Sequence, residues 1–290
     1  MFGEKVLVLD GAMGTVLKNK NIDKKFFNST TSFEILNITA EAEIKDVHRE
    51  YIEAGADIIE TNTFNCNRFS LKGTEFEDSV YKICKKGAEI AKEVAKNYGN
   101  RVLIAGSIGP TVVSLTQNLT VEDELRKSYR EQIGGLIDGR VDLLLIETVY
   151  DYRNLKLALE VSEELFKNKR LNIPIIISFT CSEKGEIYSG ESIQNIIKEI
   201  DNESIVGYGL NCVGMAQFIE KLSDITSKKI IFYPNDIILK ELDNNLENYI
   251  YNLLKKNYIH IIGGCCGTDS KYIEKIKKIV KTFNCNKIVK

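Results

Sequence analysis

Residues 142–151 read DLLLIETVYD, a short apolar run that ends in the acidic residue Glu147. The four consecutive apolar residues 143–146 have the length and composition of a strand that is buried on both faces. The segment that follows, 153–167, carries apolar residues at the spacing of an amphipathic helix. This unit of a buried strand, a polar residue at its end and a helix indicates a parallel sheet covered by helices.

The same unit recurs along the whole chain. Candidate strands lie at 6–9, 57–61, 102–106, 143–147, 175–179, 206–211, 230–233 and 259–263. Helical patterns lie at 42–54, 79–98, 121–138, 153–167, 192–200, 215–222, 244–257 and 270–282, so a helix follows every strand. Eight such repeats in 290 residues predict an α/β protein with one (β/α)8 TIM barrel domain, residues 1–290. An open doubly wound sheet is the alternative, and the polar segment 19–37 is predicted to be an elaborated first loop.

The composition argues against several classes of protein. The 39 basic and 41 acidic residues give a formal net charge of −2, so nucleic acid is not expected as the main partner. No apolar run approaches the roughly 18 residues that cross a bilayer, so a membrane protein is not expected either. The N-terminus lacks the features of a secretory leader, and the seven cysteines are an odd number. We therefore expect a cytoplasmic protein whose cysteines are reactive or bind a metal.

Residues with useful chemistry gather just after the predicted strands. In a parallel barrel the loops after the strands form the active face, so residues far apart in the sequence are expected to meet there. The set comprises Asp10, Gly11, Thr61, Asn62, Thr63, Ser107, Glu147, Asn211, Cys212, Cys265 and Cys266.

Three cysteines of this set suit one metal ion. Cys212 follows one predicted strand, and Cys265 and Cys266 follow the strand two further along the chain. Because neighbouring residues on a regular strand point to opposite faces, the adjacent pair can face one ion only where the backbone turns. Glycines at 263, 264 and 267 permit that turn. Three thiolates suit Zn²⁺ and leave its fourth tetrahedral position open to water or substrate, which favours a catalytic site.

The sequence alone leaves other interpretations of the cysteines open. A free cysteine is most often a small buried apolar residue, and this is the expected state of Cys66, Cys84, Cys181 and Cys285. The adjacent pair could instead form a redox-active disulfide. Cys66 and Cys181 also follow predicted strands, and a fourth ligand from either would make the zinc site closed and structural.

Six motifs together resemble the homocysteine S-methyltransferase family. They are LDGAMGT at 9–15, GADIIETNTFN at 55–65, GSIGPT at 106–111, DLLLIETVYD at 142–151, GLNCVG at 209–214 and GGCCGT at 263–268. The resemblance covers essentially the whole chain and is greatest to the homocysteine-binding domain of cobalamin-dependent methionine synthase. GGCCGT with an upstream NC is highly specific, whereas DGAMGT or GSIGPT alone would be less so.

The resemblance implies a zinc-dependent barrel enzyme that transfers a methyl group to the thiolate of L-homocysteine and forms methionine. By motif position, the zinc ligands, which act catalytically through the metal, are Cys212, Cys265 and Cys266. The residues that hold the amino acid end of homocysteine are Asp10, Gly11 and Glu147. Asn211 is also assigned to the substrate pocket; satisfying backbone groups of the barrel is the alternative for this residue.

The chemistry of the side chains agrees with these roles. A free alkyl thiol is mostly protonated near neutral pH, and coordination to Zn²⁺ removes its proton. Glu147 is the natural partner of a substrate ammonium group, and Asp10 could share that task; capping a helix is the alternative for both. Neither histidine is assigned a role, because His48 is predicted on the surface of a helix and His260 within the last strand.

Two departures from the family concern the methyl donor. After the seventh strand the family usually reads YPNAGLP, whereas here Asn235 is followed by Asp236, Ile237 and Ile238. Methionine synthases of this type continue into folate, cobalamin and activation modules, whereas this chain stops at Lys290. The resemblance therefore implies methylcobalamin carried by a separate corrinoid- or folate-binding protein. The alternatives are a small donor such as S-methylmethionine, or a substrate-binding or structural-zinc subunit without turnover.

Overall fold

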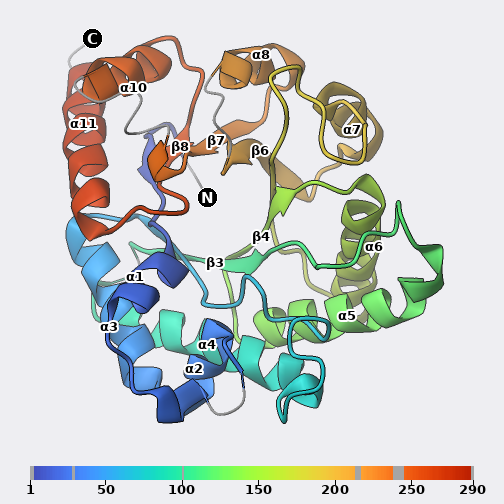
Figure 1. The fold of residues 1–290 in the computed structure, drawn as a ribbon. Coiled ribbons are helices and arrows are strands. Elements are labelled where there is room, and N and C mark those ends of the chain that lie inside the picture. Colours follow the sequence, from blue (N-terminus) through green and yellow to red (C-terminus); the bar gives the residue numbers. More distant parts are fainter. Residues whose placement is uncertain (1–2, 28–29, 100, 213–216, 238–244, 289–290) are drawn as a thin grey trace.

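Eight parallel strands lie side by side in the order β1-β8-β7-β6-β5-β4-β3-β2 (Figure 1). The computed structural model describes residues 3–27, 30–99, 101–212, 217–237 and 245–288. The strands are β1 (Leu7–Val8), β2 (Ile58–Glu60), β3 (Leu103–Ile108), β4 (Leu143–Val149), β5 (Ile175–Phe179), β6 (Ile205–Asn211), β7 (Lys229–Tyr233) and β8 (Ile261–Ile262). All eight predicted strands are confirmed.

Helices connect consecutive strands and cover the outside of the sheet (Figure 1). They are α1 (Met13–Asn19), α2 (Leu36–Thr39), α3 (Glu41–Ala54), α4 (Val80–Lys96), α5 (Glu122–Asp138), α6 (Tyr152–Lys169), α7 (Ile193–Ile200), α8 (Gln217–Ile225), α10 (Leu246–Lys255) and α11 (Ser270–Ile288). The predicted helix starts at 215 and 244 lie outside the described residues. The predicted first loop, 19–37, is more regular than expected, because the 3₁₀ helices Lys24–Phe27 and Phe33–Ile35 and the start of α2 lie within it.

The sheet closes into a barrel between β1 and β2. Leu9 forms a parallel bridge with Ile58, and the amide of Asp57 donates to the carbonyl of Val8 at 2.7 Å. The Asp57 carboxylate accepts a hydrogen bond from the Val8 amide at 2.9 Å and one from the Lys277 ammonium at 2.7 Å, which ties the seam to α11. The predicted (β/α)8 barrel is thus confirmed, and the open sheet is excluded.

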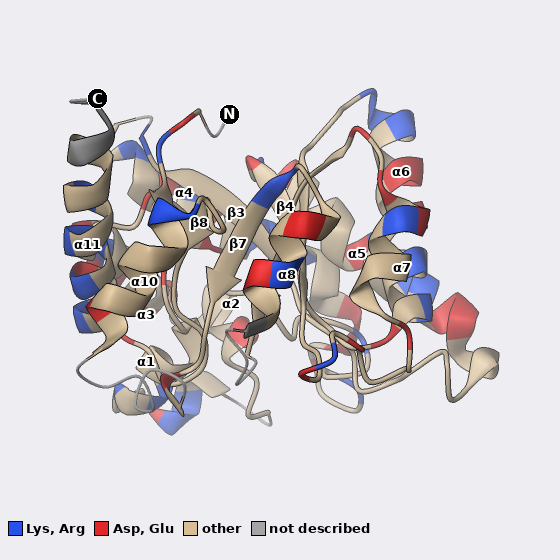
Figure 2. Cartoon of the chain, turned by 90° about the horizontal axis from the view of Figure 1, so that it is seen from above, with Lys and Arg blue, Asp and Glu red and all other residues tan. Residues whose placement is uncertain are grey.

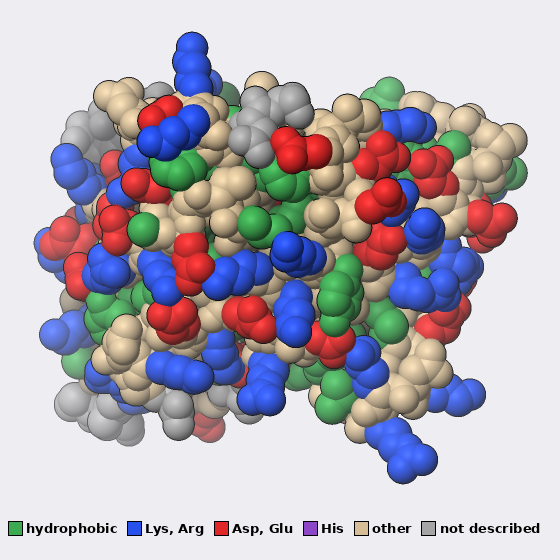
Figure 3. All heavy atoms as spheres, turned by 90° about the horizontal axis from the view of Figure 1, so that it is seen from below, with side chains coloured by type: hydrophobic (Ala, Val, Ile, Leu, Met, Phe, Trp, Pro, Cys, Tyr) green, Lys and Arg blue, Asp and Glu red, His purple; other side chains and the backbone are tan. Residues whose placement is uncertain are grey.

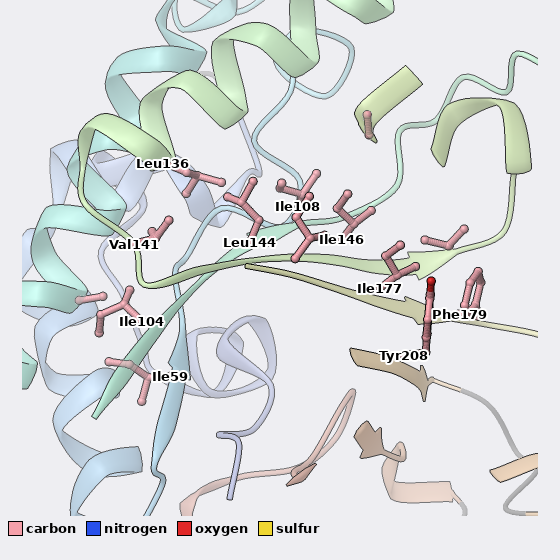
Figure 4. Packing of buried hydrophobic residues seen from close by; sticks show 14 of the residues in the cluster. Ile59, Ile104, Ile108, Leu136, Val141, Leu144, Ile146, Ile177, Phe179 and Tyr208 are labelled. Carbon is pink, nitrogen blue, oxygen red and sulfur yellow. The ribbon is translucent and has the colours of Figure 1, made fainter. Parts of the chain in front are cut away.

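Alternate residues of each strand pack on opposite sides of the barrel wall. On β4, Leu143 and Leu145 belong to the small apolar cluster inside the barrel. Leu144 belongs to the larger cluster between strands and helices, where its side chain faces Leu136 of α5 (Figure 4). Because side chains alternate along a strand, Glu147 projects on the same side as Leu145, toward the inside of the barrel.

His48 is buried, so the prediction that it lies on the surface of its helix is wrong. Its side chain has 0% exposure and lies four residues from both Ile44 and Ile52, on the stripe of α3 that packs inward. Burial lowers its pKa to about 4. His260 directly precedes β8, and its Nδ1 accepts a hydrogen bond from the Ile230 amide at 3.1 Å.

Charged side chains of both signs are distributed over the outer helices (Figure 2). On the face shown in Figure 3, Lys and Arg alternate with Asp and Glu, and apolar side chains form small separate groups. This mixture agrees with the net charge of −2 and gives that face no single-sign patch. None of the helices in the described part of the chain is long and apolar enough to cross a membrane.

Candidate metal centre and substrate pocket

The structure brings Cys212, Cys265 and Cys266 together at the end of the barrel where the strands finish. Cys212 follows the last residue of β6 and has a left-handed backbone (φ 54°). Cys265 and Cys266 lie in the turn after β8. The three sulfur atoms all lie within 4.8 Å of one another, and those of Cys212 and Cys266 are 3.5 Å apart.

The sulfur cluster fits a tetrahedral metal ion. With Zn–S bonds of about 2.3 Å, two sulfur ligands of a tetrahedron are about 3.8 Å apart. Hydrogen bonds with the Cys212 and Cys265 thiols lower the pKa of Cys266 to about 3, whereas hydrogen bonds with the Cys212 and Cys266 thiols raise the pKa of Cys265. A bound cation would favour the thiolate form of all three cysteines.

Glycines allow the turn that holds Cys265 and Cys266. Gly267 has φ 84°, a left-handed conformation that side chains rarely adopt. A Cβ atom on Gly264 would lie 2.3 Å from the Oγ1 atom of Thr268, so the chain passes too close here for a larger residue. The turn at Gly267 is thus one that glycine permits, as expected.

The loop after β7, which departs from the family pattern, packs directly on this turn. The Cys265 amide donates to the Pro234 carbonyl at 2.9 Å, and the Asp236 amide donates to the Cys266 carbonyl at 2.9 Å. Substitutions in the loop can therefore act on the position of the cysteines. Ile238, the last of the departing residues, lies outside the described residues.

The remaining cysteines lie outside the sulfur cluster. Cys66 and Cys84 are fully buried in the core, and Cys181 is partly buried against it. Cys285 is exposed, so its predicted burial is wrong; it lies on the side of α11 opposite the buried Ile276. Among the described residues, no fourth cysteine, histidine or carboxylate joins the three ligands, which gives a closed four-cysteine site no support.

Three carboxyl groups gather next to the cysteines inside the barrel mouth. The amide of Glu60 donates to Asp10 Oδ2 at 3.0 Å, and the carboxyl groups of Glu60 and Glu147 lie close enough to shift each other's pKa. Burial raises the pKa of all three groups, and the charge of Glu147 raises that of Glu60 further. Close carboxyl groups in a buried site favour a shared proton, because two neighbouring negative charges repel each other.

Asp10 and Glu147 are held in different ways. Glu147 is buried, and its two oxygens accept hydrogen bonds from the Ser107 hydroxyl at 2.5 Å and the Tyr233 hydroxyl at 3.4 Å. Asp10 Oδ1 is buried and has no hydrogen-bond partner in the part of the chain that the structure describes. A buried carboxylate oxygen without a donor suits a cationic ligand.

Glu60 is the site residue that sequence reasoning missed. It ends β2 and lies two positions after Ile58, which belongs to the apolar cluster inside the barrel. This alternation was the available signal, because it predicts that Glu60 points to the same side as Ile58. The prediction relied instead on the polar residues that follow the strand.

The other polar residues at strand ends mainly bond to the protein itself. Thr61 and Thr63 share a hydrogen bond of 2.6 Å, and the Thr63 hydroxyl also donates to the Ser107 carbonyl at 2.7 Å. The side-chain amide of Asn62 donates to the Phe33 carbonyl at 2.8 Å. These residues therefore complete the hydrogen bonding of the loops around the mouth.

Gly11 and Asn211 are both tightly enclosed. A Cβ atom on Gly11 would lie 2.9 Å from the Thr268 Oγ1 and Tyr51 hydroxyl oxygen atoms. Asn211 is fully buried, and protein groups fill the hydrogen-bonding capacity of its amide. The structure thus places Asn211 against Thr148, Ser178 and Cys265.

Comparisons with known proteins identify the family of the chain. The family model for homocysteine S-methyltransferase matches residues 7–280. The metallated form of the homocysteine methyltransferase MmuM from Escherichia coli superimposes with a TM-score of 0.76 at 22% identity, covering 95% of this chain and 96% of that chain. Its oxidized form gives a TM-score of 0.73 at 22% identity, covering 94% and 95%.

A more distant match shows how widely the barrel itself is shared. The old yellow enzyme homologue from Zymomonas mobilis has a TM-score of 0.52 at 8% identity, covering 89% of this chain and 84% of that chain. At such identities the solved structures support the fold alone. The family model spans nearly the whole barrel and includes all three clustered cysteines. The chain therefore belongs to the homocysteine S-methyltransferase family of methyltransferase enzymes.

Proposed function

We propose that this protein transfers a methyl group to the sulfur of L-homocysteine and forms methionine, with Zn²⁺ held by Cys212, Cys265 and Cys266. The observation that carries the proposal is the position of the thiol cluster beside a carboxyl cluster in one barrel mouth. Homocysteine carries a thiol at one end and an ammonium group at the other, and the two clusters suit these ends. The whole chain, residues 1–290, then acts as one homocysteine-binding barrel domain.

Each cluster has a defined task in this proposal. Zn²⁺, when bound, would keep the substrate sulfur as a thiolate at neutral pH, because the pKa of a free alkyl thiol is about 8.5. Asp10 Oδ1, which lacks a partner among the described residues, accepts a hydrogen bond from the substrate ammonium. Glu147, oriented by Ser107 and Tyr233, is the second acceptor. Holding both ends of the substrate aligns its sulfur with the methyl carbon, and such orientation lowers barriers by roughly 7–11 kcal/mol in favourable cases.

The substrate carboxylate lies, in this proposal, against the backbone after β1. Gly11 follows Asp10 directly, and backbone N–H groups of a turn can bind an anion. The amide of Ala12 already donates to the Thr268 hydroxyl at 3.4 Å, which holds this turn against the loop of the cysteines. The amino acid end and the sulfur end of the substrate are thus bound by two loops that contact each other.

The donor that we propose is a methyl-corrinoid carried by a separate protein. The resemblance of the motifs to methionine synthase supports this choice. Large exposed apolar side chains also occur in the loops after β3, β5 and β7, at the end of the barrel that holds the site: they are Val112, Leu119, Tyr188 and Ile237. A carrier protein would have to approach the site from this end of the barrel.

X-ray absorption at the zinc edge, before and after addition of L-homocysteine, tests the metal and the substrate together. We expect three sulfur ligands and one lighter atom in the free protein, and four sulfur ligands after homocysteine binds. Four sulfur ligands from the start, unchanged by homocysteine, would show a closed structural site and end the proposal.

A pair of cysteine variants tests the ligand assignment. Cys265→Ala should lose both zinc and activity, because two thiolates rarely suffice for a tight site. Cys84→Ala is the matched control, since Cys84 is buried away from the cluster and should leave the zinc content at one per chain. Stoichiometric zinc in Cys265→Ala would refute the assignment.

Activity assays with each methyl donor decide between a corrinoid donor, a small donor and a subunit without turnover. We expect methionine formation from a methylcobalamin-loaded carrier protein and little from S-methylmethionine. Turnover with S-methylmethionine alone would replace the corrinoid donor by a small one. A protein that binds homocysteine and turns over neither donor would be a substrate-binding subunit.

A further inference from the structure

The side chain of Asn211 connects the two clusters of the site. Its Oδ1 atom accepts hydrogen bonds from the Thr148 amide at 3.0 Å and from the Ser178 hydroxyl at 2.8 Å. Its Nδ2 atom donates to Thr148 Oγ1 at 2.7 Å and to Cys265 Sγ at 3.8 Å. Thr148 directly follows Glu147, so one buried amide joins the strand of the carboxyl cluster to a thiol of the sulfur cluster.

The orientation of this amide is determined by its neighbours. A backbone N–H group can only donate, so the Thr148 amide must face the oxygen of Asn211. The Nδ2 group must then face Thr148 Oγ1 and the Cys265 sulfur, because a flipped amide would place two donors against each other. Cys265 therefore receives an N–H hydrogen bond, which stabilises its thiolate form.

Thr148 has a backbone conformation that needs support. Its φ is 56°, in the left-handed region, and the register of β4 against β5 shifts between Ile146 and Val149. β-branched residues rarely adopt a left-handed backbone conformation, and they keep it where the surrounding structure stabilises it. Asn211 holds Thr148 at both its amide and its hydroxyl, at the point where the strand ends and Glu147 turns into the mouth.

We propose that Asn211 is a positioning residue with two separable tasks. Its oxygen holds the irregular end of β4 and with it the direction of Glu147. Its N–H group stabilises the Cys265 thiolate and withdraws electron density from that sulfur. The second task rests on the proposed function, because it assumes that Cys265 ligates the metal, whereas the first does not.

Two substitutions separate the tasks. Asn211→Asp retains an oxygen that accepts from Thr148 and Ser178, but it replaces the N–H donor by a second carboxylate oxygen beside the sulfur. Asn211→Ala removes both. Asn37→Ala is the matched control, because Asn37 is also fully buried and donates to the Asn62 carbonyl at 2.8 Å, outside the thiol and carboxyl clusters.

The first measurement is hydrogen exchange of the Thr148 amide in the metal-free full-length protein. We expect exchange at least about tenfold faster in Asn211→Ala, and rates near wild type in Asn211→Asp and Asn37→Ala. Unchanged protection in Asn211→Ala would overturn the positioning of β4. This outcome does not depend on metal or substrate.

The second measurement is Co²⁺ binding, with its affinity from competition with a chelator and its sulfur-to-metal charge-transfer band. We expect Asn211→Asp and Asn211→Ala to bind about 10–100-fold more weakly and to shift the band to lower energy, since the sulfur becomes more electron-rich. Asn37→Ala should match wild type in both. An unchanged band and affinity in Asn211→Asp would overturn the thiolate task. If the wild-type protein binds no Co²⁺, the proposed metal site is refuted, and so is the role of Asn211 toward Cys265. Hydrogen exchange of the Thr148 amide still decides whether Asn211 positions the end of β4.

Discussion

The buried imidazole of His48 should make this protein lose stability in mild acid. Its ring has 0% exposure, and neither nitrogen has a hydrogen-bond partner among the described residues. Burial lowers the pKa from 6.5 to about 4. The unfolded chain therefore binds a proton at a higher pH than the folded protein does. The contribution to stability is complete above pH 6.5 and is lost as the pH falls toward 4.

The size of the effect follows from the two pKa values. One pKa unit corresponds to about 1.4 kcal/mol, so the free energy of unfolding should fall by about 3 kcal/mol through His48 alone between pH 7 and pH 4. His48→Leu removes this proton-binding ring. At pH 7 the variant should be at least as stable as wild type, because two buried polar atoms without partners are replaced by apolar ones.

Urea unfolding at a series of pH values measures the difference directly. The chain has no tryptophan, so circular dichroism is the suitable signal. The carboxyl cluster titrates in both proteins, and its contribution cancels when the curves are subtracted. We expect the two unfolding free energies to diverge by about 3 kcal/mol from pH 7 to pH 4. Parallel curves would refute the reasoning, since they would mean that His48 is protonated equally in both states.

Two further predictions concern the pocket and the barrel wall. Glu147→Gln and Asp10→Asn should each weaken homocysteine binding about 10–100-fold, because each loses a charged hydrogen bond to the substrate. Titration calorimetry measures this loss, and the zinc content should stay unchanged. Binding at wild-type strength would show that the substrate ammonium lies elsewhere. Gly209→Ala should lower the thermal midpoint, because a Cβ would lie 2.4 Å from the Ile231 carbonyl oxygen. Gly14→Ala is the control: it lies in α1, has no neighbour closer than 4.0 Å, and should gain up to about 1 kcal/mol.

The polar residues at the ends of the predicted strands were the most informative part of the sequence. Short apolar runs that stop at Asp10, Glu147 and Asn211 predicted both the barrel and the edge at which its functional residues meet. The cysteine cluster followed from the same pattern, because a closed parallel barrel leaves the loops after its strands only one place to converge. The resemblance of the motifs added the reaction, which no spacing of residues could supply.

The wrong or missing predictions concern residues whose burial and contacts depend on packing and not on residue type. His48 was predicted on the surface of its helix, yet α3 buries a stripe wide enough to include it. Glu60 was missed because the prediction used the polar residues that follow the strand and not the alternation of side chains within it. The bonds of Asn211 depend on the irregular end of β4, and a register shift of this kind leaves no periodic trace in the sequence.

The pairing of β1 with β8 should make metal release and strand fraying coupled events. β1 and β8 share only the pairs Leu7 with Ile261 and Val8 with Ile262, which join the two ends of the chain. Closing so long a loop has a large entropic cost, so this corner should open more readily than the rest of the barrel. The Gly264 amide donates to the Asp10 carbonyl at 3.0 Å, so a metal that holds the turn after β8 to Cys212 would oppose that opening. A chelator should therefore speed proteolysis of the first residues before it lowers the helical content of the remaining chain.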